Sequence, residues 1–205
     1  MIVGSEGGLI VFAREPRSGH VKTRLAASIG DAAALDVYTK LLTRTLHLAE
    51  QSVFHQRYLF CENTTQVDYF QSLLNAELWI TRAQPTGDLG QRMHDAFVSV
   101  LRAHDYAVLI GSDVADLELS DIDSAAAALE TRERHCVIGP TADGGYWLIG
   151  LGRAEETLFE SIPWSTDSVA PLTLSKMSQL GLSVTRLHLR HDVDELDDLK
   201  YLRSV

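Results

Sequence analysis

The chain has 205 residues, of which 45% are hydrophobic and 22% charged, and its 28 acidic and 18 basic residues give a formal charge of −10. This balance is typical of a folded globular chain and argues against a disordered or fibrous one. The acidic excess argues against nucleic acid or an anionic membrane as a partner. We predict a single domain over residues 1–205.

Short apolar runs alternate with amphipathic stretches along the chain. The apolar runs predict strands at 9–12, 57–61, 78–80, 106–110, 136–138, 146–151 and 183–189. Apolar spacing of three and four residues predicts helices from Asp31, from about Thr65, over 91–102, from a Ser120–Asp123 capping box to Leu129, over 169–180, and from about Glu195 to Arg203. The alternation predicts an α/β fold with a mostly parallel sheet covered on both faces, whose ligands lie at the carboxyl ends of the strands.

A basic segment directly follows the first predicted strand. Arg14, Arg17, Lys22 and Arg24 lie within eleven residues that contain one acid, Glu15. Such a loop can bind phosphate through its cations and its backbone N–H groups, and Gly19 allows close approach. The alternative is a solvated basic turn, since neither a P-loop nor a dinucleotide-binding glycine pattern is present.

Acidic residues follow two other predicted strands. Asp113 comes after 106–110, and Asp192 and Asp194 come after 183–189. Carboxylates are the ligands that Mg²⁺ and Mn²⁺ prefer, which makes Asp113 and Asp192 the better metal candidates. The alternatives are local caps, with Asp194 and Asp197 fitting a capping box. Asp116 and Ser120 are better placed as caps than as ligands.

Two glycine-containing segments add polar groups. In 139–147, Asp143 could bind sugar hydroxyls or act as a base, although an Asp-Gly pair between apolar runs is also the ordinary signal of a hairpin. In 84–93, polar groups could contact a nucleobase edge, or Asp88 could cap the following helix. We expect a cap in the segment 164–166 and structural roles for His188 and His191.

Three further features of the sequence bear on the cellular compartment of the protein. Cys61 and Cys136 form no CxxC pair and are too few for a disulfide framework or a thiolate zinc site, which favours a reducing environment. No apolar run approaches the roughly 18 residues that span a bilayer. The N-terminus has no basic leader, which argues against a signal peptide. We expect a cytoplasmic protein.

Six segments occur in one order and together form a pattern: REPRSGHVKTRL from 14, GDLGQRM from 87, GSDVADL from 111, DGGYWLIGL from 143, WST from 164 and DVDELDDL from 192. Between Phe12 and Leu199 this pattern resembles small bacterial glycosyltransferase-like proteins with a GT-A, nucleotide-diphospho-sugar transferase fold. That family was long a domain of unknown function, and some members are associated with arsenosugar biosynthesis. It is more distantly similar to 2-phospholactate and molybdenum cofactor guanylyltransferases.

The resemblance implies a three-layer, Rossmann-like GT-A fold with a mixed, mostly parallel sheet, and Mg²⁺ or Mn²⁺ as cofactor. It also implies a set of site residues: a phosphate loop of Arg14, Gly19, Lys22, Thr23 and Arg24; a nucleotide-facing turn of Gly87, Asp88 and Gly90; metal ligands Asp113, Asp192 and Asp194; an acceptor side of Asp143, Gly144, Gly145 and Tyr146; and catalytic roles for Asp113 and Asp143. Three positions depart from the family pattern. Arg14 replaces a lysine, Ala115 a proline and Glu195 a threonine.

Three functions are compatible with these features. We slightly favour a metal-dependent glycosyltransferase that uses a nucleotide sugar and a small-molecule acceptor, because the aromatic residues at 146–147 suit the face of a sugar. A nucleotidyltransferase that transfers NMP from an NTP to a phosphorylated acceptor is the alternative, because a triphosphate favours a strongly basic loop. A non-catalytic nucleotide sensor is the third. Neither nucleic acid nor membrane is expected as a partner, and a homodimer is left open.

Overall fold

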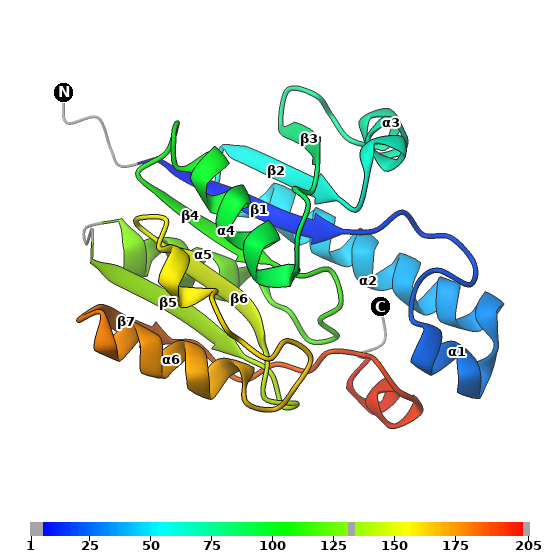
Figure 1. The fold of residues 1–205 in the computed structure, drawn as a ribbon. Coiled ribbons are helices and arrows are strands. Elements are labelled where there is room, and N and C mark those ends of the chain that lie inside the picture. Colours follow the sequence, from blue (N-terminus) through cyan, green and yellow to red (C-terminus); the bar gives the residue numbers. More distant parts are fainter. Residues whose placement is uncertain (1–5, 131–133, 203–205) are drawn as a thin grey trace.

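The structure, a computed structural model, describes residues 6–130 and 134–202. It contains one seven-stranded sheet of order β3-β2-β1-β4-β6-β5-β7 (Figure 1). The strands are β1 Gly7–Ala13, β2 Gln56–Cys61, β3 Trp79–Ala83, β4 Tyr106–Ile110, β5 His135–Pro140, β6 Tyr146–Leu151 and β7 Ser183–Arg186. β6 runs antiparallel to β4 and β5, and the other neighbouring strands are parallel. The predicted mixed, mostly parallel sheet is confirmed.

Helices cover both faces of the sheet. They are α1 Thr23–Ile29, α2 Asp31–Gln51, α3 Thr64–Leu73, α4 Leu89–Val100, α5 Leu119–Leu129 and α6 Val169–Gln179, with short 3₁₀ helices η1 Glu156–Leu158 and η2 Leu196–Tyr201. Along β1, Leu9 and Val11 pack toward α2, α3 and α5, whereas Ile10 packs toward α4 and α6. This two-residue alternation makes β1 apolar on both faces, as expected for a central parallel strand.

One helix was not predicted. The segment expected to be a loop up to Arg24 instead enters α1 at Thr23, so Thr23 and Arg24 lie in the first turn of a helix. α1 has seven residues and buries Leu25 alone, too short a pattern to produce a helical stripe. Leu25 packs with Leu41 of α2 and with Val193, so α1 is stabilised by tertiary contacts rather than by its own sequence.

Several predicted caps are wrong by one or two positions. The box of α5 uses Glu118 and Asp121 rather than Ser120 and Asp123, and Asp123 instead accepts a hydrogen bond from the Val53 N–H at 3.0 Å. The last element is a 3₁₀ helix, not an α-helix, and its box uses Glu195 and Asp198. The pairs Glu118/Asp121 and Glu195/Asp198 have the same spacing as the predicted pairs, so spacing alone could not select between them.

The predicted hairpin at 143–145 connects β5 and β6. The prediction of a cap at 164–166 is not supported, because the Thr166 hydroxyl donates to the Pro163 carbonyl at 2.8 Å and Ser168 is the N-cap of α6. β7 ends at Arg186 rather than 189, but the following chain stays extended and forms isolated bridges that pair Thr141 with Arg190 and Val114 with Asp192. These bridges carry Asp192 to the end of β4.

Cys61 and Cys136 are both buried as free thiols, on opposite faces of the sheet. Within the described ranges, no helix is long and apolar enough to cross a membrane.

Candidate active site

A cleft of about 850 Å³ lies at the carboxyl edge of the sheet. Segments that follow β1, β3, β4, β5 and β7 line it, together with the segment before α6. The predicted site residues among its lining are Arg14, Lys22, Thr23, Arg24, Asp88, Asp113, Asp143, Gly145, Tyr146, Asp192 and Asp194. Residues up to 180 positions apart in sequence therefore meet at one site.

Four predicted glycines do not line this cleft: Gly19, Gly87, Gly90 and Gly144. A side chain at Gly90 would meet the Phe159 carbonyl at 2.6 Å, so Gly90 permits close packing of α4. Gly144 has φ +89°, and a Cβ there would strike the Asp167 backbone. The Gly144 carbonyl also accepts a hydrogen bond from Ala170 at 2.8 Å. Gly90 and Gly144 thus shape the walls of the cleft from behind.

The Lys22 ammonium lies at the centre of the acidic part of the cleft. Its Nζ is 3.1 Å from Asp113 Oδ2 and 3.0 Å from Asp194 Oδ1, and the side chain is only 4% exposed. Burial alone would lower the pKa of Lys22, but Asp113 and Asp194 together raise it above its ordinary value. Lys22 is therefore a charged ammonium held between two carboxylates.

Asp113 and Asp192 are brought together by the extended chain after β7. The Val193 N–H donates to the Asp113 carbonyl at 3.2 Å, and Asp192 bridges to Val114. Burial and the neighbouring carboxylates, Asp113 foremost, raise the pKa of Asp192 to about 7 against the opposing effect of Lys22. The two acids repel each other at short range, which is the arrangement that a bound cation relieves.

Asp194 is engaged differently. Its Oδ1 pairs with Lys22, and its Oδ2 lies 3.6 Å from a guanidinium nitrogen of Arg24. Burial opposes ionisation, but Lys22 and Arg24 hold the pKa of Asp194 below its usual value. Asp194 acts here as an ion-pair partner of the basic segment. The carboxylate of Asp192, in contrast, forms no hydrogen bond or ion pair with the described residues.

The donor set fits a divalent cation that is completed by its substrate. Across residues 6–130 and 134–202, no three His, Cys, Asp or Glu side chains are grouped to hold a metal unaided. Mg²⁺ commonly takes only one or two carboxylates and fills its shell with water and substrate phosphates. Asp113 Oδ1 is buried without a hydrogen-bond partner among the described residues. That orphaned oxygen and the unpaired Asp192 would hold such an ion.

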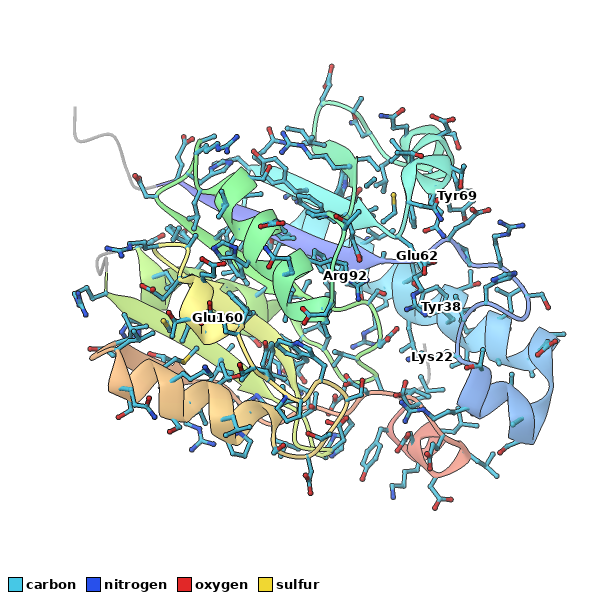
Figure 2. The ribbon with its side chains drawn as sticks, in the orientation of Figure 1. Lys22, Tyr38, Glu62, Tyr69, Arg92 and Glu160 are labelled. Atoms are coloured by element: carbon cyan, nitrogen blue, oxygen red, sulfur yellow. The ribbon has the colours of Figure 1, made fainter. Side chains whose placement is uncertain are left out.

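Tyr38 lines the cleft although the sequence did not mark it as a candidate, because it falls within the apolar spacing of the helix predicted from Asp31. Its hydroxyl accepts from the Arg14 N–H at 2.9 Å, donates to the Arg14 carbonyl at 3.0 Å and lies 3.3 Å from Ser112 Oγ. Figure 2 shows Tyr38 and Lys22 near each other at the edge of the cleft. Tyr38 thereby joins the loop after β1 to the loop after β4. Nothing in the sequence distinguishes it from a core tyrosine.

A second missed residue is Arg92 of α4, which Figure 2 places on the other side of the cleft from Lys22. It donates to Gln84 Oε1 at 2.8 Å and to the Asp88 carbonyl at 3.3 Å. The Asp88 carboxylate caps α4 by accepting from the Gln91 N–H at 2.9 Å. The capping role, the alternative given for Asp88, is therefore observed, and Gln84 and Arg92 line the cleft beside it.

The segment that the resemblance assigns to the acceptor side lies over β5 and β6. Asp143 Oδ1 accepts hydrogen bonds from Thr141 Oγ1 at 2.5 Å and from the Gly145 N–H at 3.0 Å, leaving its other oxygen without a partner among the described residues. Tyr146 packs edge-on against Trp164, with ring centroids 6.5 Å apart. Burial raises the pKa of Tyr146, so its phenol stays neutral. Trp164 lines the cleft rather than lying in the core.

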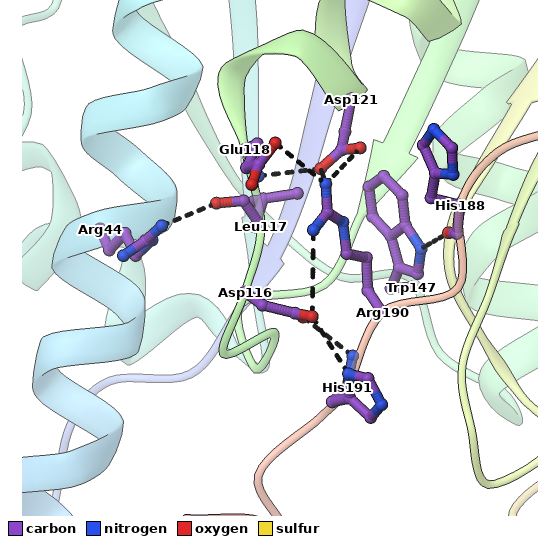
Figure 3. Close-up of polar contacts among 9 residues, drawn as sticks. All are labelled: Arg44, Asp116, Leu117, Glu118, Asp121, Trp147, His188, Arg190 and His191. Atoms are coloured by element: carbon purple, nitrogen blue, oxygen red, sulfur yellow. Dashed lines mark hydrogen bonds and ion pairs between the residues drawn. The ribbon is translucent and has the colours of Figure 1, made fainter. Parts of the chain in front are cut away.

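The segment that carries Asp192 is anchored by a buried ionic network, shown in Figure 3. Arg190 pairs with Asp121 at 2.8 Å, with Glu118 at 3.3 Å and with Asp116 at 3.9 Å. Asp116 also accepts from the His191 N–H at 3.0 Å, and its other oxygen pairs with the His191 ring at 3.0 Å. Asp116 is thus not a cap but a tether between the β4–α5 loop and the chain before Asp192.

The structural role expected of His191 is observed, whereas the His188 side chain is exposed and a structural role for it stays a prediction. The His191 ring stacks on Tyr201, with centroids 3.7 Å apart, and the His188 carbonyl accepts from Trp147 Nε1 at 3.3 Å. The Trp147 contact holds the chain after β7 against β6, and the His191 ring holds η2 against the segment that carries Asp192.

A mixed sheet of this order, with one antiparallel strand and its ligand edge at the carboxyl ends, is the Rossmann-like fold of the nucleotide-diphospho-sugar transferases. Within that class, the chain belongs to the family described as "Uncharacterized protein conserved in bacteria (DUF2064)", which matches residues 45–166. A search of curated proteins found no match.

Solved structures resemble the whole chain. A protein from Desulfovibrio desulfuricans G20, provisionally named a nucleotide-diphospho-sugar transferase, is 29% identical with a TM-score of 0.89, over 97% of this chain and 86% of that one. Two others are similar in fold. The inositol-1-phosphate CTP transferase of T. maritima has a TM-score of 0.63 and 15% identity, over 97% and 94% of the two chains. Rv0371c of Mycobacterium tuberculosis H37Rv, in complex with manganese, has a TM-score of 0.57 and 17% identity, over 98% of each chain.

Proposed function

We propose that the protein is a metal-dependent transferase that moves a sugar from a nucleotide-activated donor to a small acceptor, with Mg²⁺ or Mn²⁺ as cofactor. One observation carries the proposal: the two halves of the cleft differ in chemistry. Over β3, β2, β1 and β4 the cleft carries all the cations found among its described lining residues: Arg14, Lys22, Arg24 and Arg92.

Over β6 and β5 the lining is aromatic and acidic. It includes Tyr146, Trp164, Asp143 and Asp167, and no Lys, Arg or His among the described residues of that half. Such a surface suits an acceptor with hydroxyl groups and an apolar face, and it would repel a phosphorylated one. This division favours glycosyl transfer over nucleotidyl transfer to a phosphate.

Each half has a defined task in this proposal. Arg14, Lys22 and Arg24 bind the donor phosphates, since charge-assisted hydrogen bonds to phosphate are strong in a recessed site. Asp113 and Asp192 would hold the divalent cation, which would supply neutralisation of the negative charge that develops on the leaving group. Asp143 has one oxygen fixed by Thr141 and Gly145, which leaves the other to accept the proton of an acceptor hydroxyl.

Similar proteins support this proposal in part. The relative from Desulfovibrio desulfuricans carries the name of a nucleotide-diphospho-sugar transferase, and a structure of similar fold contains manganese. The T. maritima structure of similar fold is named a CTP transferase, which keeps nucleotidyl transfer as the second candidate. The dense basic segment 14–24 also favours that candidate, because a triphosphate carries more charge than a nucleotide sugar.

The two candidates release different products, so product identity tests them. We expect slow, Mn²⁺-dependent hydrolysis of a nucleotide sugar to nucleoside diphosphate and free sugar when water replaces the acceptor. Asp113→Asn should abolish that turnover, whereas Asp36→Asn, on the exposed face of α2, should not. Pyrophosphate release from an NTP with a phosphorylated acceptor, and no turnover of any nucleotide sugar, would establish the second candidate instead.

A further inference from the structure

The ammonium of Lys22 lies between carboxylates of the cleft and neutralises part of their negative charge. Lys22 contacts the carboxylates of Asp113 and Asp194 at 3.1 and 3.0 Å. Asp192 lies beside this pair, because its chain bridges to Val114. The Lys22 side chain is 4% exposed, whereas those of Asp113 and Asp194 are 44% and 41% exposed. Because the ammonium itself is removed from water, its attraction to the two carboxylates is stronger than that of a fully exposed pair, although water still reaches the carboxylates.

The backbone at Lys22 is adapted to this contact. Lys22 has φ 49° and ψ 45°, the left-handed region that residues with a Cβ rarely occupy, and it precedes the first turn of α1 without capping it through its side chain. A glycine or asparagine would adopt this conformation more easily. Lys22 keeps it because the turn directs the side chain inward, where Asp113 and Asp194 hold it.

The ammonium neutralises only part of the acidic cluster. Asp113 uses Oδ2 for Lys22, and its Oδ1 is buried without a hydrogen-bond partner among the described residues. Within the same residues Asp192 has no ion pair, and the ion pair of Arg24 is with Asp194. The cluster therefore has capacity for a further cation, but that cation must share Asp113 with Lys22. Two cations on one carboxylate weaken each other's binding.

We propose that Lys22 is the resident counter-ion of the acidic cluster and competes with the divalent cation for Asp113, so that donor diphosphate and metal bind cooperatively. The diphosphate draws the ammonium away from Asp113 and frees that carboxylate for the metal. Lysine suits this exchange because its charge is compact and its stem is flexible. The inference rests on the proposed function for the identity of the diphosphate, but its metal-binding part does not.

The first experiment measures Mn²⁺ binding to the protein without nucleotide, from the electron paramagnetic resonance signal of free Mn²⁺. We expect Lys22→Met to bind Mn²⁺ more tightly than wild type by about fivefold or more, the lower end of typical coupling between sites. Lys40→Met is the matched control, because it removes the same charge from an exposed lysine that pairs with Asp36 on α2. Lys40→Met should match wild type.

The second experiment repeats the titration with ADP, CDP, GDP and UDP, each tested singly. For a nucleotide that binds, the wild-type Mn²⁺ affinity should rise by about 5- to 150-fold, and the nucleotide affinity should rise by the same factor. In Lys22→Met that factor should fall, because no resident cation remains to be displaced. Lys22→Arg, which keeps the charge, provides a second variant should Lys22→Met not fold, and it should retain weak binding of Mn²⁺ alone.

Unchanged or weaker Mn²⁺ affinity in folded Lys22→Met would overturn the inference, as would an undiminished coupling factor. A different result would overturn the proposed function alone. If none of the four nucleotides bound while Lys22→Met still bound Mn²⁺ more tightly than Lys40→Met, the competition between Lys22 and the metal would be supported and the proposed nucleotide-activated donor would be rejected.

Discussion

The hydroxyl of Tyr38 binds both backbone polar groups of Arg14, 24 residues earlier in the chain, at 2.9 and 3.0 Å. A side chain of α2 thus supplies the hydrogen bonds that the backbone of the loop after β1 would otherwise form with a neighbouring strand. Because the same hydroxyl lies 3.3 Å from Ser112, it also sets the spacing between the basic loop and the loop that carries Asp113.

Tyr38→Phe should therefore destabilise the protein by roughly 1–3 kcal/mol, the cost of leaving a partly buried backbone group unsatisfied. Urea denaturation measures this loss, and faster hydrogen exchange at the Arg14 amide would locate it. Tyr69→Phe is the matched control, because Tyr69 is a half-buried tyrosine on α3 outside the cleft. Equal stability losses in the two variants would show that the Arg14 contact contributes nothing specific.

Asp113→Asn should keep the fold and lose the effect of Mn²⁺ on nucleotide binding. The amide cannot supply the anionic oxygen that Asp113 offers at Oδ1, so the metal-dependent part of the affinity should fall at least about tenfold, or ~1.4 kcal/mol. Titration calorimetry with and without Mn²⁺ measures it. Retention of the full metal effect would remove Asp113 from the site.

Replacing Lys22 and Arg24 together with Ala should weaken nucleotide binding in the absence of metal. Each lost charge-assisted contact to phosphate contributes about 1.5–3 kcal/mol, or roughly 10- to 100-fold in affinity, so the double variant should lose roughly 100-fold or more. A nucleoside without phosphates should bind the double variant nearly as well as wild type. Parallel losses for nucleotide and nucleoside would instead indicate that the loop or α1 has collapsed.

Asp116 should contribute to stability in a pH-dependent way. Burial alone would raise its pKa, but the His191 hydrogen bonds, with Arg190, hold it below the usual value. Because the pKa of Asp116 is lower in the folded chain than its value of about 3.9 in the unfolded chain, the ionised carboxylate stabilises the fold at pH values above about 3.9. This contribution disappears as the pH falls through the lower pKa of the folded state. Asp116→Asn should lower the free energy of unfolding at pH 6, and this deficit should shrink as the pH falls below about 3.9. A deficit independent of pH would contradict this account.

The thiols should be inert in the folded protein. Burial raises the pKa of Cys61 to about 11 and that of Cys136 to about 12, so neither supplies thiolate at pH 8. A disulfide reagent should modify both cysteines only after denaturant is added. Rapid reaction of either thiol in native buffer would show that its face of the sheet opens readily.

Much of the fold could be predicted from the residues alone. The fully apolar run at 106–110 coincides with β4, because a central strand buried on both faces needs no alternation to be recognised. The positions of acids and bases just after strands predicted where the cleft lies, since parallel strands end at one edge of the sheet. These signals are local in sequence, so composition and spacing contain them.

What the tertiary structure decided is which groups meet. Lys22 pairs with Asp194 across 172 positions, and α1 forms because Leu25 packs with Leu41 and Val193. The same contacts distinguish Asp192, which has no ion pair in the part of the chain that the structure describes, from Asp194, which is neutralised by Lys22 and Arg24. In sequence these two aspartates are nearly equivalent. Their roles differ because the energy of a charge depends on its distance from other charges and from water, and only the folded chain sets those distances.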